Sequence, residues 1–420
     1  MLLLLLACRP SSPPEPAAAP APAPAAAAAP LQCGAPSPAA PGALERWPYL
    51  QDVQATSAVV AFVGQSGAAG AVSFGAPGAP AQQVAAARQD LRTNDSEAPD
   101  AELHPLFHSR LTGLQPDTEY CYEVAIDGQT MASGLRFRTA PADAATAVRF
   151  LVIGDFGDGG AGQLAVRDTL MKHTDGVRFV LTTGDNAYAA ADYDELHRYV
   201  FPIYQDLLAR VPMYPVAGNH DYATADLAPY LQNFFLPQNT LKAADAERYY
   251  SFDWGPVHIA ALDTERTSKE VSAEAKDDQL DWLGADLAAS QRPWKLLAMH
   301  RPGWSSFSKR PGSVFIRDQV RPVAEANGVQ LALQGHDHFY ERYVAQVQGA
   351  PTAPEQGGLT WIITGGAGSK LYPVEPGTNL AVSLSVRHFL VVDADTCHLR
   401  VEAIDEAGAT IDTWEQQRCP

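Results

Sequence analysis

Polar side chains that can bind metal ions or transfer protons stand directly after several apolar segments of this sequence. The segments end in GDFGDGG, GDNAY, GNHD, MH and GHDH, and glycine precedes the polar residue in four of the five. Glycine lets the backbone turn sharply off a strand and admits close approach of a bound group. Five such segments indicate one shared site rather than separate loops that are polar by chance. The residues concerned are Asp155, Asp185, Tyr188, Asn219, His220, His300, His336 and His338.

The mixture of ligand types in this set constrains the metal. Carboxylate, phenolate, amide oxygen and imidazole together suit borderline to hard first-row ions, and the set contains no thiolate. Seven side chains are too many for one ion. They imply two cations about 3.5 to 4 Å apart around a bridging carboxylate, an arrangement that clamps the attacking and leaving oxygens of a phosphoryl transfer. Within GHDH we expect His336 and His338 to be ligands and Asp337 to point away.

A dinucleotide site is the alternative for part of this set. GDGGAG, residues 157–162, matches the G-x-G-x-x-G pattern between a strand and a helix, and Asp185 stands where such a fold keeps its ribose-binding carboxylate. The charge of Asp155, however, enters the turn where a pyrophosphate would need bare amides. This alternative also leaves the histidines of MH and GHDH without a role, so the metal site is the favoured interpretation.

The elements that carry these residues indicate an α/β domain over residues 146–420. VRFLVIGD, AGQLAVRDTLMKHT and VRFVLTTGD predict a strand, a helix and a second strand, which make a parallel βαβ unit. In such sheets ligands collect beyond the carboxyl ends of the strands. TGGAGS, residues 364–369, is expected at the rim of the site, although a plain tight turn has the same pattern. His258 lies inside an apolar strand and is expected to be a packed core histidine.

The five cysteines indicate disulfide bonds away from the metal site. Cys397 and Cys419 flank two alternating segments around a Glu-Ala-Gly turn, which predicts a C-terminal β-hairpin closed by a disulfide bond. With Cys8 assigned to a lipid anchor, Cys33 and Cys121 are the pair that remains, and no pattern indicates their bond directly. An even set of four is typical of an oxidising compartment.

Residues 43–140 have a different texture, with short alternating segments separated by turns. SAVVAFV, AVSFG, EYCYEVAI and GLRFRT predict a small antiparallel β-sandwich. Within it, LTGLQPDTEYCYEV resembles the fibronectin type III signature. The resemblance implies that Tyr120 is a corner tyrosine whose hydroxyl group bonds to the preceding loop.

The first 42 residues indicate export. MLLLLLAC is too short to span a bilayer and resembles a bacterial lipoprotein signal in which Cys8 carries the lipid. No Lys or Arg precedes the apolar run, so a mis-set start codon and a plain hydrophobic N-terminus remain alternatives. Residues 9–42 are almost entirely Pro, Ala and Ser, which predicts an extended spacer. We therefore expect a secreted or cell-envelope protein that meets a membrane only through this anchor.

The charge balance limits the partners of the protein. Its 48 acidic and 30 basic residues give a formal net charge of -18. Nucleic acid and anionic membrane surfaces are therefore repelled over most of the protein. A site that carries its own cations can still bind a small anion, so we expect a small phosphorylated substrate.

The ordered motifs GDFGDGG, GDNAY, GNHD, MH and GHDH resemble those of the purple acid phosphatases, within the calcineurin-like metallophosphoesterases. The resemblance covers roughly residues 43 to 395. It implies an α/β catalytic domain, a β-sandwich of mixed sheets flanked by helices, preceded by an all-β fibronectin type III-like sandwich. It also implies Fe(III) at Asp155, Tyr188 and His338, a bridging Asp185, and a divalent ion (Fe, Zn or Mn) at Asn219, His300 and His336.

The function implied by this resemblance is that of an acid phosphatase. A hydroxide that bridges the two metals would hydrolyse phosphate monoesters at acidic pH. His220 is expected to contact the phosphate, to protonate the leaving oxygen or to orient a ligand. Lys309 and Arg310 stand where larger members carry histidines that act on the leaving group, and a binding role and plain surface charge both remain open.

Two other functions remain as alternatives. The first is a phosphodiesterase or nucleotidase that uses two divalent metals on the same scaffold. The second is a surface binding module in which the β-sandwich makes the contacts, although the presence of all seven candidate ligands argues against it.

Overall fold

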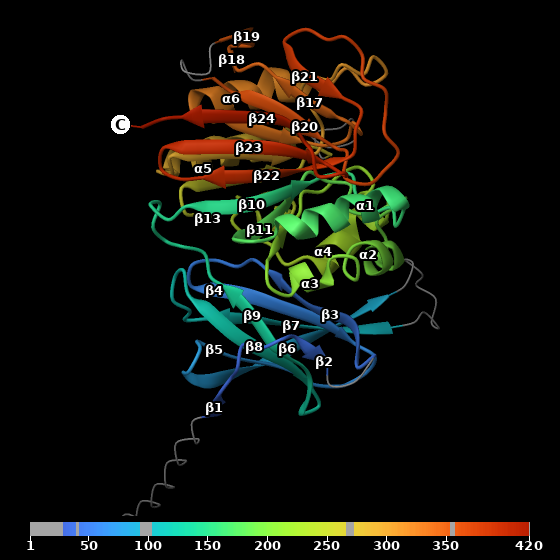
Figure 1. Ribbon diagram of the computed structural model, residues 1–420, viewed down its shortest axis with the longest axis vertical. Coiled ribbons are helices and arrows are strands. Elements are labelled where there is room, and N and C mark those ends of the chain that lie inside the picture. The colour runs from blue at the N-terminus through green and yellow to red at the C-terminus, as the bar shows by residue number, and fades with distance from the viewer. Residues whose placement is uncertain (1–27, 39–41, 93–102, 266–272, 353–357, 420) are drawn as a thin grey trace, which may run out of the picture.

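The computed structural model describes residues 28–38, 42–92, 103–265, 273–352 and 358–419. An all-β part lies at one end of the molecule and a larger α/β part at the other (Figure 1). The predicted lipid anchor at Cys8 lies outside the described residues, as does most of the predicted spacer. Among the residues described, no helix is both long enough and apolar enough to cross a membrane.

The all-β part is the antiparallel sandwich that the sequence predicts. Its two layers share one long strand, β6, which pairs with β5 through residues 82–86 and with β7 through residues 87–92. The Tyr120 hydroxyl accepts a hydrogen bond from the Gln115 N–H at 2.9 Å, so the predicted tie to the preceding loop is confirmed. The strands are β3 (Leu44–Gln51), β4 (Ser57–Gly64), β5 (Gly70–Gly75), β6 (Pro80–Arg92), β7 (Leu103–Thr112), β8 (Glu119–Ile126) and β9 (Gln129–Arg138).

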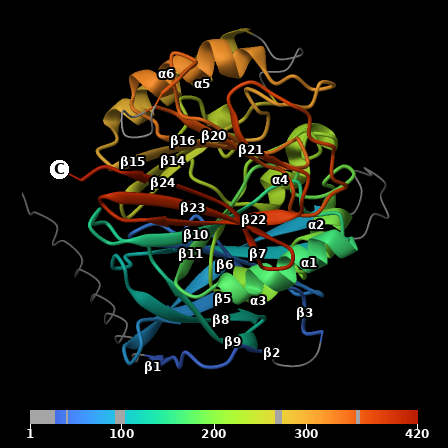
Figure 2. The ribbon, with the colours of Figure 1, turned by 45° about the horizontal axis from the view of Figure 1, so that its top comes forward.

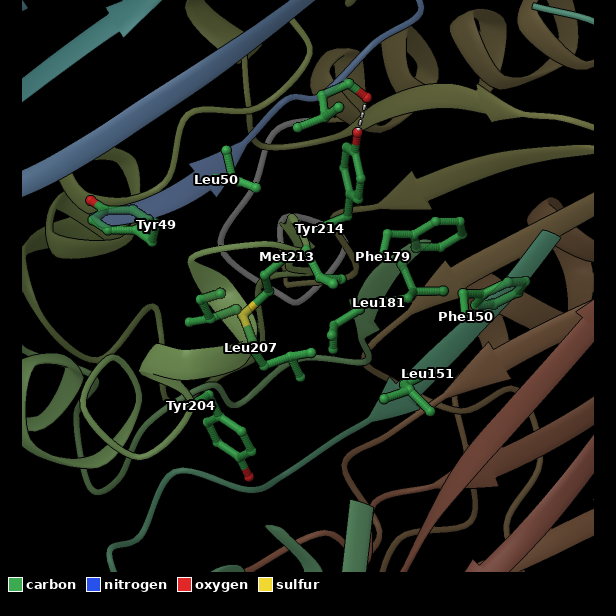
Figure 3. Packing of buried hydrophobic residues seen from close by; sticks show 14 of the residues in the cluster. Tyr49, Leu50, Phe150, Leu151, Phe179, Leu181, Tyr204, Leu207, Met213 and Tyr214 are labelled. Atoms are coloured by element: carbon green, nitrogen blue, oxygen red, sulfur yellow. Dashed lines mark hydrogen bonds between the residues drawn. The ribbon is translucent and has the colours of Figure 1, made fainter. Parts of the chain in front are cut away.

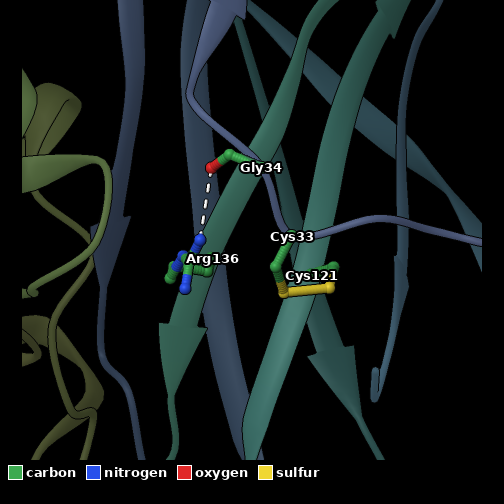
Figure 4. Close-up of a disulfide and its surroundings, with 4 residues drawn as sticks. All are labelled: Cys33, Gly34, Cys121 and Arg136. Atoms are coloured by element: carbon green, nitrogen blue, oxygen red, sulfur yellow. Dashed lines mark hydrogen bonds between the residues drawn. A yellow bond between two sulfur atoms is a disulfide. The ribbon is translucent and has the colours of Figure 1, made fainter. Parts of the chain in front are cut away.

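Part of the predicted spacer belongs to this sandwich. Strand β1 (Ala28–Pro30) pairs with β6, and β2 (Ser37–Pro38) pairs with β9. Between them Cys33 forms a disulfide bond with Cys121 of β8 (Figure 4). Residues 28–38 are therefore attached to the fold, and the expectation of a spacer that reaches residue 42 is wrong for this stretch.

The α/β part contains two facing sheets, one of six strands and one of seven, and both mix parallel and antiparallel pairs. The six-stranded sheet has the order β12-β11-β10-β22-β23-β24, and the seven-stranded sheet has the order β13-β14-β15-β16-β20-β17-β21. The strands are β10 (Val148–Ile153), β11 (Val177–Thr182), β12 (Met213–Tyr214), β13 (Tyr250–Trp254), β14 (Val257–Leu262), β15 (Trp294–Met299), β16 (Leu331–Gln334), β17 (Tyr340–Tyr343), β20 (Thr360–Thr364), β21 (Leu380–Leu384), β22 (His388–Ala394), β23 (His398–Asp405) and β24 (Thr410–Gln417), with β18 (Gln346–Val347) and β19 (Ala350–Pro351) as a separate pair.

Helices cover the outer faces of these sheets. Figure 2 shows α5 and α6 over the seven-stranded sheet, while α1 and α2 lie on the side of the six-stranded sheet. The α-helices are α1 (Ala161–Leu170), α2 (Tyr193–Tyr199), α3 (Gln205–Leu208), α4 (Ala228–Asn233), α5 (Ala273–Ala289) and α6 (Arg321–Ala326); η1 (Met171–His173), η2 (Ala225–Leu227) and η3 (Ala243–Asp245) are 3-10 turns, and η4 (Ile316–Val320) is a π-helical segment.

Alternation along the strands builds two cores. In β16, Leu331 and Leu333 enter the core between the sheets, whereas Ala332 faces the core under the helices. This is the period of two expected of a strand that is buried on both faces. The predicted fold class is confirmed.

The sandwich and the α/β part are joined by buried contacts. Leu50 of β3 lies near Met213 and Tyr214 of β12 (Figure 3), and the neighbouring Gln51 Nε2 donates to the Met213 carbonyl at 3.2 Å. The Tyr214 hydroxyl donates a hydrogen bond to the Val53 carbonyl at 2.6 Å. Because these contacts bury apolar surface as well as pairing polar groups, the sandwich packs as part of the same hydrophobic core.

The C-terminal hairpin forms as predicted, but its disulfide bond does not. Strands β23 and β24 pair from His398 opposite Gln417, and the Arg418 N–H donates to the Cys397 carbonyl at 2.7 Å. Cys397 and Cys419 are free thiols, so the predicted bond between them is wrong. The backbone pairing of β23 with β24 therefore holds the two ends of the hairpin together without a disulfide bond.

Candidate metal centre

The predicted site residues meet at one edge of the two facing sheets. Asp155 follows β10, Asp185 follows β11, His300 follows β15 and His336 follows β16. These strands run parallel in pairs, so their carboxyl ends point to the same edge. Backbone hydrogen bonds fix the loops to one another, since the Asp155 N–H donates to the Gly184 carbonyl and the Gly335 N–H donates to the His300 carbonyl.

One group of side chains surrounds the Tyr188 hydroxyl. This oxygen lies 3.2 Å from Asp155 Oδ1 and 3.3 Å from His338 Nε2. His338 Nε2 lies 3.3 Å from Asp155 Oδ1, so the three atoms form a small triangle. The resemblance assigns these three residues to Fe(III), and the structure brings them together.

A second group surrounds His300 Nε2. This nitrogen lies 3.2 Å from Asn219 Oδ1 and 3.2 Å from His336 Nδ1. Asp185, His300 and His336 also offer ligand atoms that all lie within 4.8 Å of one another. These groups match the set that the resemblance assigns to the divalent ion, together with the bridging carboxylate.

Asp185 connects the two groups. Its Oδ2 lies 3.2 Å from the Tyr188 hydroxyl, and its Oδ1 lies 3.3 Å from His300 Nε2. Each oxygen of the carboxylate thus faces a different group. This is the placement that a bridging ligand needs.

The second nitrogens of two histidines show why this cluster suits cations. His300 Nδ1 lies 2.8 Å from the Thr183 carbonyl, and His338 Nδ1 lies 2.8 Å from the Lys370 carbonyl. A carbonyl can only accept, so each Nδ1 carries the hydrogen and each neutral ring presents a lone pair on Nε2. Lone pairs of nitrogen and oxygen then face one another in a buried space. A metal cation satisfies all of them at once, and the donor set therefore fits two ions.

The backbone is held in an unusual conformation at three of these positions. Asp155, Asp185 and His336 have φ values of 56°, 51° and 72°. Such left-handed conformations cost about 1 to 3 kcal/mol each for residues other than glycine and cluster at functional sites. The neighbouring glycines allow the close packing, because a Cβ on Gly218 would overlap with Asp185 and one on Gly335 would overlap with Asp155.

Burial and opposite charge shift the pKa values of these groups in opposite directions. Burial lowers the pKa of His300, but the Asp185 carboxylate outweighs it and raises that pKa to about 10. Burial raises the pKa of Asp185, yet His300 pulls it well below the usual range. Burial and the carboxylates of Asp155 and Asp185 raise the pKa of Tyr188. The Asp185 carboxylate therefore favours positive charge at His300.

Comparison with known proteins agrees with this geometry. The profile of the calcineurin-like phosphoesterase family matches residues 148–340, which include all eight predicted site residues. Residues 148–340 form a calcineurin-like phosphoesterase domain.

Purple acid phosphatases are among the similar proteins. Purple acid phosphatase 15 of Arabidopsis thaliana is 24% identical over 270 residues, which cover 56% of this chain and 49% of that protein. Human tartrate-resistant acid phosphatase type 5 is 28% identical over 229 residues, which cover 47% of this chain and 69% of that protein. The chain spans about half the length of most of the curated relatives it matches.

The fold of a solved purple acid phosphatase extends the similarity beyond the phosphoesterase domain. The enzyme from yellow lupin seeds superimposes with a TM-score of 0.76 at 20% identity, over 92% of this chain and 75% of that one. The resemblance that the motifs indicate is confirmed. The fibronectin type III assignment of the N-terminal sandwich stays a prediction.

His220 of the phosphoesterase domain lies at the open side of the centre. Its backbone N–H donates to Asp185 Oδ1 at 2.8 Å, and its ring packs on the Tyr188 ring with centroids 4.5 Å apart. His220 Nδ1 bonds to the Ala189 carbonyl, which leaves Nε2 unprotonated in the neutral ring. The imidazole is 35% exposed, so Nε2 can meet a substrate.

The residues around GHDH and MHRP settle two open questions. Asp337 is fully buried and lies outside the two groups, 3.8 Å from Arg310 Nη1, so the prediction that it points away from the metals is confirmed. Arg310 Nη1 donates to the His336 carbonyl at 3.1 Å. Lys309 is exposed and makes no hydrogen bond or ion pair among the described residues, so of the two cations only Arg310 reaches the centre.

Some supporting residues were not predicted from the sequence. Asp221 is buried and accepts hydrogen bonds from the Gly218 N–H and the Asn186 side chain, which ties the GDNAY and GNHD loops together. Burial and the charge of Asp185 raise the pKa of Asp221 to about 7. Tyr372 stacks on His338 with ring centroids 4.3 Å apart. Asn186 and Asp221 lie inside the GDNAY and GNHD motifs, so the motifs could have indicated their role. No sequence pattern indicates Tyr372.

Two loops that contain several glycines have different roles. In GDGGAG the Gly159 N–H donates to Gln163 Oε1 and the Gly160 N–H donates to Asp158 Oδ1, so these amides are not free for a pyrophosphate. The dinucleotide alternative is therefore wrong. In TGGAGS the Ser369 N–H donates to the Asp155 carbonyl at 3.0 Å, which confirms that this loop borders the centre.

Proposed function

We propose that the protein hydrolyses phosphate monoesters at acidic pH, at a centre that holds Fe(III) and a divalent ion, Fe, Zn or Mn. The observation that carries the proposal is the position of Asp185, with one carboxylate oxygen facing each group of candidate ligands. The phosphoesterase fold and the similar purple acid phosphatases support hydrolysis of phosphoesters.

Each ion has a stated set of residues in this proposal. Asp155, Tyr188 and His338 hold the ferric ion, and Asn219, His300 and His336 hold the divalent ion. When bound, the two cations would lower the pKa of a water molecule and neutralise charge on the phosphoryl group. The phenol oxygen of Tyr188 supports the ferric assignment, because a trivalent ion favours the deprotonated phenolate that burial alone opposes.

The side chains around the centre have separate tasks. His220 faces the open side, and with hydrogen on both ring nitrogens its Nε2–H is placed to donate to a phosphate oxygen or to pass a proton to the leaving oxygen. The Thr183 and Lys370 carbonyls keep the imidazoles of His300 and His338 in the tautomer that binds a metal. The buried Asp221 holds the loops that carry Asp185 and Asn219.

A comparison of substrates tests the proposal. The purified protein is reconstituted with iron and zinc, and turnover of p-nitrophenyl phosphate is compared with that of bis(p-nitrophenyl) phosphate between pH 4 and pH 9. We expect faster turnover of the monoester with an optimum below pH 7. Faster turnover of the diester, with full activity from two divalent ions alone, would instead establish a phosphodiesterase.

We also infer that the protein acts outside the cytoplasm. The apolar run that ends at Cys8 supports export, and the disulfide bond between Cys33 and Cys121 suits an oxidising compartment. Mass spectrometry of the mature N-terminus tests this inference. A diacylglyceryl group on Cys8 is expected, and an unprocessed Met1 would contradict it.

A further inference from the structure

Two arginines stand beside the group that contains His336. Arg301 Nη1 lies 3.3 Å from His336 Nε2, and Arg310 Nη1 lies 3.5 Å from the same atom. The two side chains are 32% and 40% exposed, so both are partly accessible beside the centre. An anion that enters the centre from this side meets two fixed positive charges.

Buried carboxylates hold both arginines in place. Arg301 Nη2 pairs with Glu265 Oε2 at 2.7 Å, and the Glu265 side chain is 7% exposed. Arg310 is held from three sides, by the His336 carbonyl at 3.1 Å, by the buried Asp337 carboxylate at 3.8 Å and by the Tyr372 ring 5.1 Å below its guanidinium carbon. Positioned guanidinium groups lose little conformational entropy when they bind, which makes them strong and selective partners of phosphate oxygens.

The chemistry of arginine decides what this pair can do for a leaving group. A guanidinium group stays protonated in proteins, so Arg310 cannot supply the proton that a basic alkoxide leaving group requires. A leaving group that is itself a phosphate needs no such proton, and it carries negative charge that charge-assisted hydrogen bonds from two guanidinium groups can stabilise.

We propose that Arg301 and Arg310 bind an anionic leaving group, so that the protein prefers substrates whose terminal phosphoryl group is linked to a second phosphate. This inference rests on the proposed phosphatase function and specifies its substrate class. The preferred bond is a phosphoanhydride rather than an alkyl phosphoester. Lys309, one residue away and outside the centre, takes no part.

The reaction balances without an acid from the protein. A P–O bond forms between the terminal phosphorus and the oxygen of one water molecule, and the P–O bond to the second phosphate breaks. The electron pair of the broken bond stays on the leaving phosphate oxygen, where the arginines face it. One proton of the water passes to solvent, and the other remains on the product phosphate or leaves according to pH.

Two substrates that differ in the leaving group test the inference. Values of kcat/KM are measured for inorganic pyrophosphate and for glycerol 2-phosphate with the metal-loaded wild type, Arg310→Ala, Arg310→Lys and Lys309→Ala. We expect the wild type to favour pyrophosphate by at least about tenfold, since a hydrogen bond to a charged group contributes about 1.5 to 3 kcal/mol. Arg310→Ala should lose about tenfold or more on pyrophosphate and much less on glycerol 2-phosphate. Arg310→Lys should fall between, and Lys309→Ala should match the wild type.

Binding provides a readout that does not depend on turnover. Isothermal titration calorimetry with imidodiphosphate, a pyrophosphate analogue whose bridging nitrogen resists hydrolysis, should give an affinity about tenfold weaker for Arg310→Ala than for Lys309→Ala. Metal analysis and circular dichroism of the variants verify that both ions and the fold are retained. Arg310→Lys provides the comparison if the alanine variant does not fold.

The outcomes separate this inference from the function on which it rests. If the metal-loaded wild type turns over both substrates equally, or if Arg310→Ala weakens both to the same degree, the leaving-group role of the arginines is wrong and the phosphatase function stands. If the metal-loaded protein hydrolyses neither of these substrates nor p-nitrophenyl phosphate, the proposed function itself is wrong.

Discussion

Two clusters of histidine and carboxylate in the α/β part have similar composition and different chemistry. In one, His258 lies between two carboxylates, with Nδ1 2.8 Å from Asp253 Oδ1 and Nε2 2.8 Å from Asp286 Oδ2. In the other, His300 Nδ1 hydrogen-bonds to the Thr183 carbonyl, and His300 Nε2 faces Asp185 Oδ1 and Asn219 Oδ1. The first cluster places one imidazole between two carboxylates, while the second gathers three imidazoles around shared carboxylates, with His336 Nδ1 only 3.2 Å from His300 Nε2.

The contrast shows that residue types alone do not make a metal site. Both nitrogens of His258 carry hydrogen when the ring is charged, so protein groups complete that cluster. At the metal centre backbone carbonyls face Nδ1 of His300 and His338, so the neutral rings turn lone pairs toward the cavity, where a cation can bind them. The first arrangement stabilises a helix against a sheet, because His258 lies on β14, Asp253 on β13 and Asp286 on α5. The second prepares a catalytic centre.

Replacing one carboxylate in each cluster should give the largest difference in phosphatase activity between the two clusters. Asp185→Asn removes the negative oxygen that both groups share, so we expect phosphatase activity to fall by about a thousandfold, which corresponds to about 4 kcal/mol of lost transition-state stabilisation. Asp253→Asn should change activity less than twofold. Steady-state kinetics and metal content by mass spectrometry measure both variants. Equal losses of activity would end the distinction between the clusters.

Removing metal should destabilise the protein through the cluster around Asp185 and not through the cluster around His258. Ions that bind the folded chain with a Kd a hundredfold to a thousandfold below their concentration stabilise it by about 3 to 4 kcal/mol. Chelation with dipicolinate should therefore lower the urea midpoint of the wild type. Asp185→Asn, which has already lost the bridge, should respond much less, and His258→Gln should respond as the wild type does. Chelation that leaves the wild-type midpoint unchanged would show that the centre holds no tightly bound ion.

Alkaline pH should destabilise the protein through the cluster around His258. Burial lowers the pKa of His258, but the hydrogen bonds with Asp253 and Asp286 outweigh it and raise that pKa to about 9. Below pH 6.5 the ring is protonated in the folded and the unfolded chain, and the stabilisation is complete. It decreases as pH rises above 6.5 and is lost above about 9, a change of about 3 kcal/mol.

Urea unfolding between pH 6 and pH 9.5 measures this loss. The wild type and His258→Gln should differ in stability at pH 6 and converge at pH 9.5, because only the wild type has the ion pairs to lose. A difference between the two proteins that stays constant with pH would mean that His258 acts by packing alone.

Tyr188 gives the smallest effect on rate and the clearest spectroscopic signal. Tyr188→Phe removes the phenol oxygen from the ferric group, so we expect the visible charge-transfer band of the oxidised protein to disappear and activity to fall about tenfold. Tyr204→Phe is the matched control, because Tyr204 is a buried tyrosine of the same domain whose hydroxyl has no hydrogen-bond partner among the described residues. A band that survives Tyr188→Phe would assign the colour to another ligand.

The sequence predicts the metal centre better than it predicts the surroundings of the centre. Asp155, Asp185, His300 and His336 follow strands, and the parallel arrangement of those strands carries them to one edge without further information. The positive φ values at three of these positions depend on contacts between distant loops, which no local pattern encodes. His258 was expected to be buried, and it is, but its partner Asp286 lies on a helix whose orientation the sequence does not define.

Differences from the predicted fold also arise from contacts between distant parts of the chain. Residues 28–38 look like spacer by composition, yet pairing with β6 and β9 and the bond from Cys33 to Cys121 attach them to the sandwich. Cys397 and Cys419 flank a correctly predicted hairpin, but the two sulfur atoms are not bonded. For Arg310 the sequence leaves a binding role and plain surface charge both open, and the folding of its loop over His336 brings it to the centre.

Metal analysis of the purified protein together with its absorption spectrum tests the central claim most directly. If the seven side chains bind two cations, the wild type contains two metal ions per chain, one of them iron, with a visible absorption band that is absent from Asp185→Asn and Tyr188→Phe. A colourless protein that takes up no iron on reconstitution, or one ion in place of two, would contradict the account.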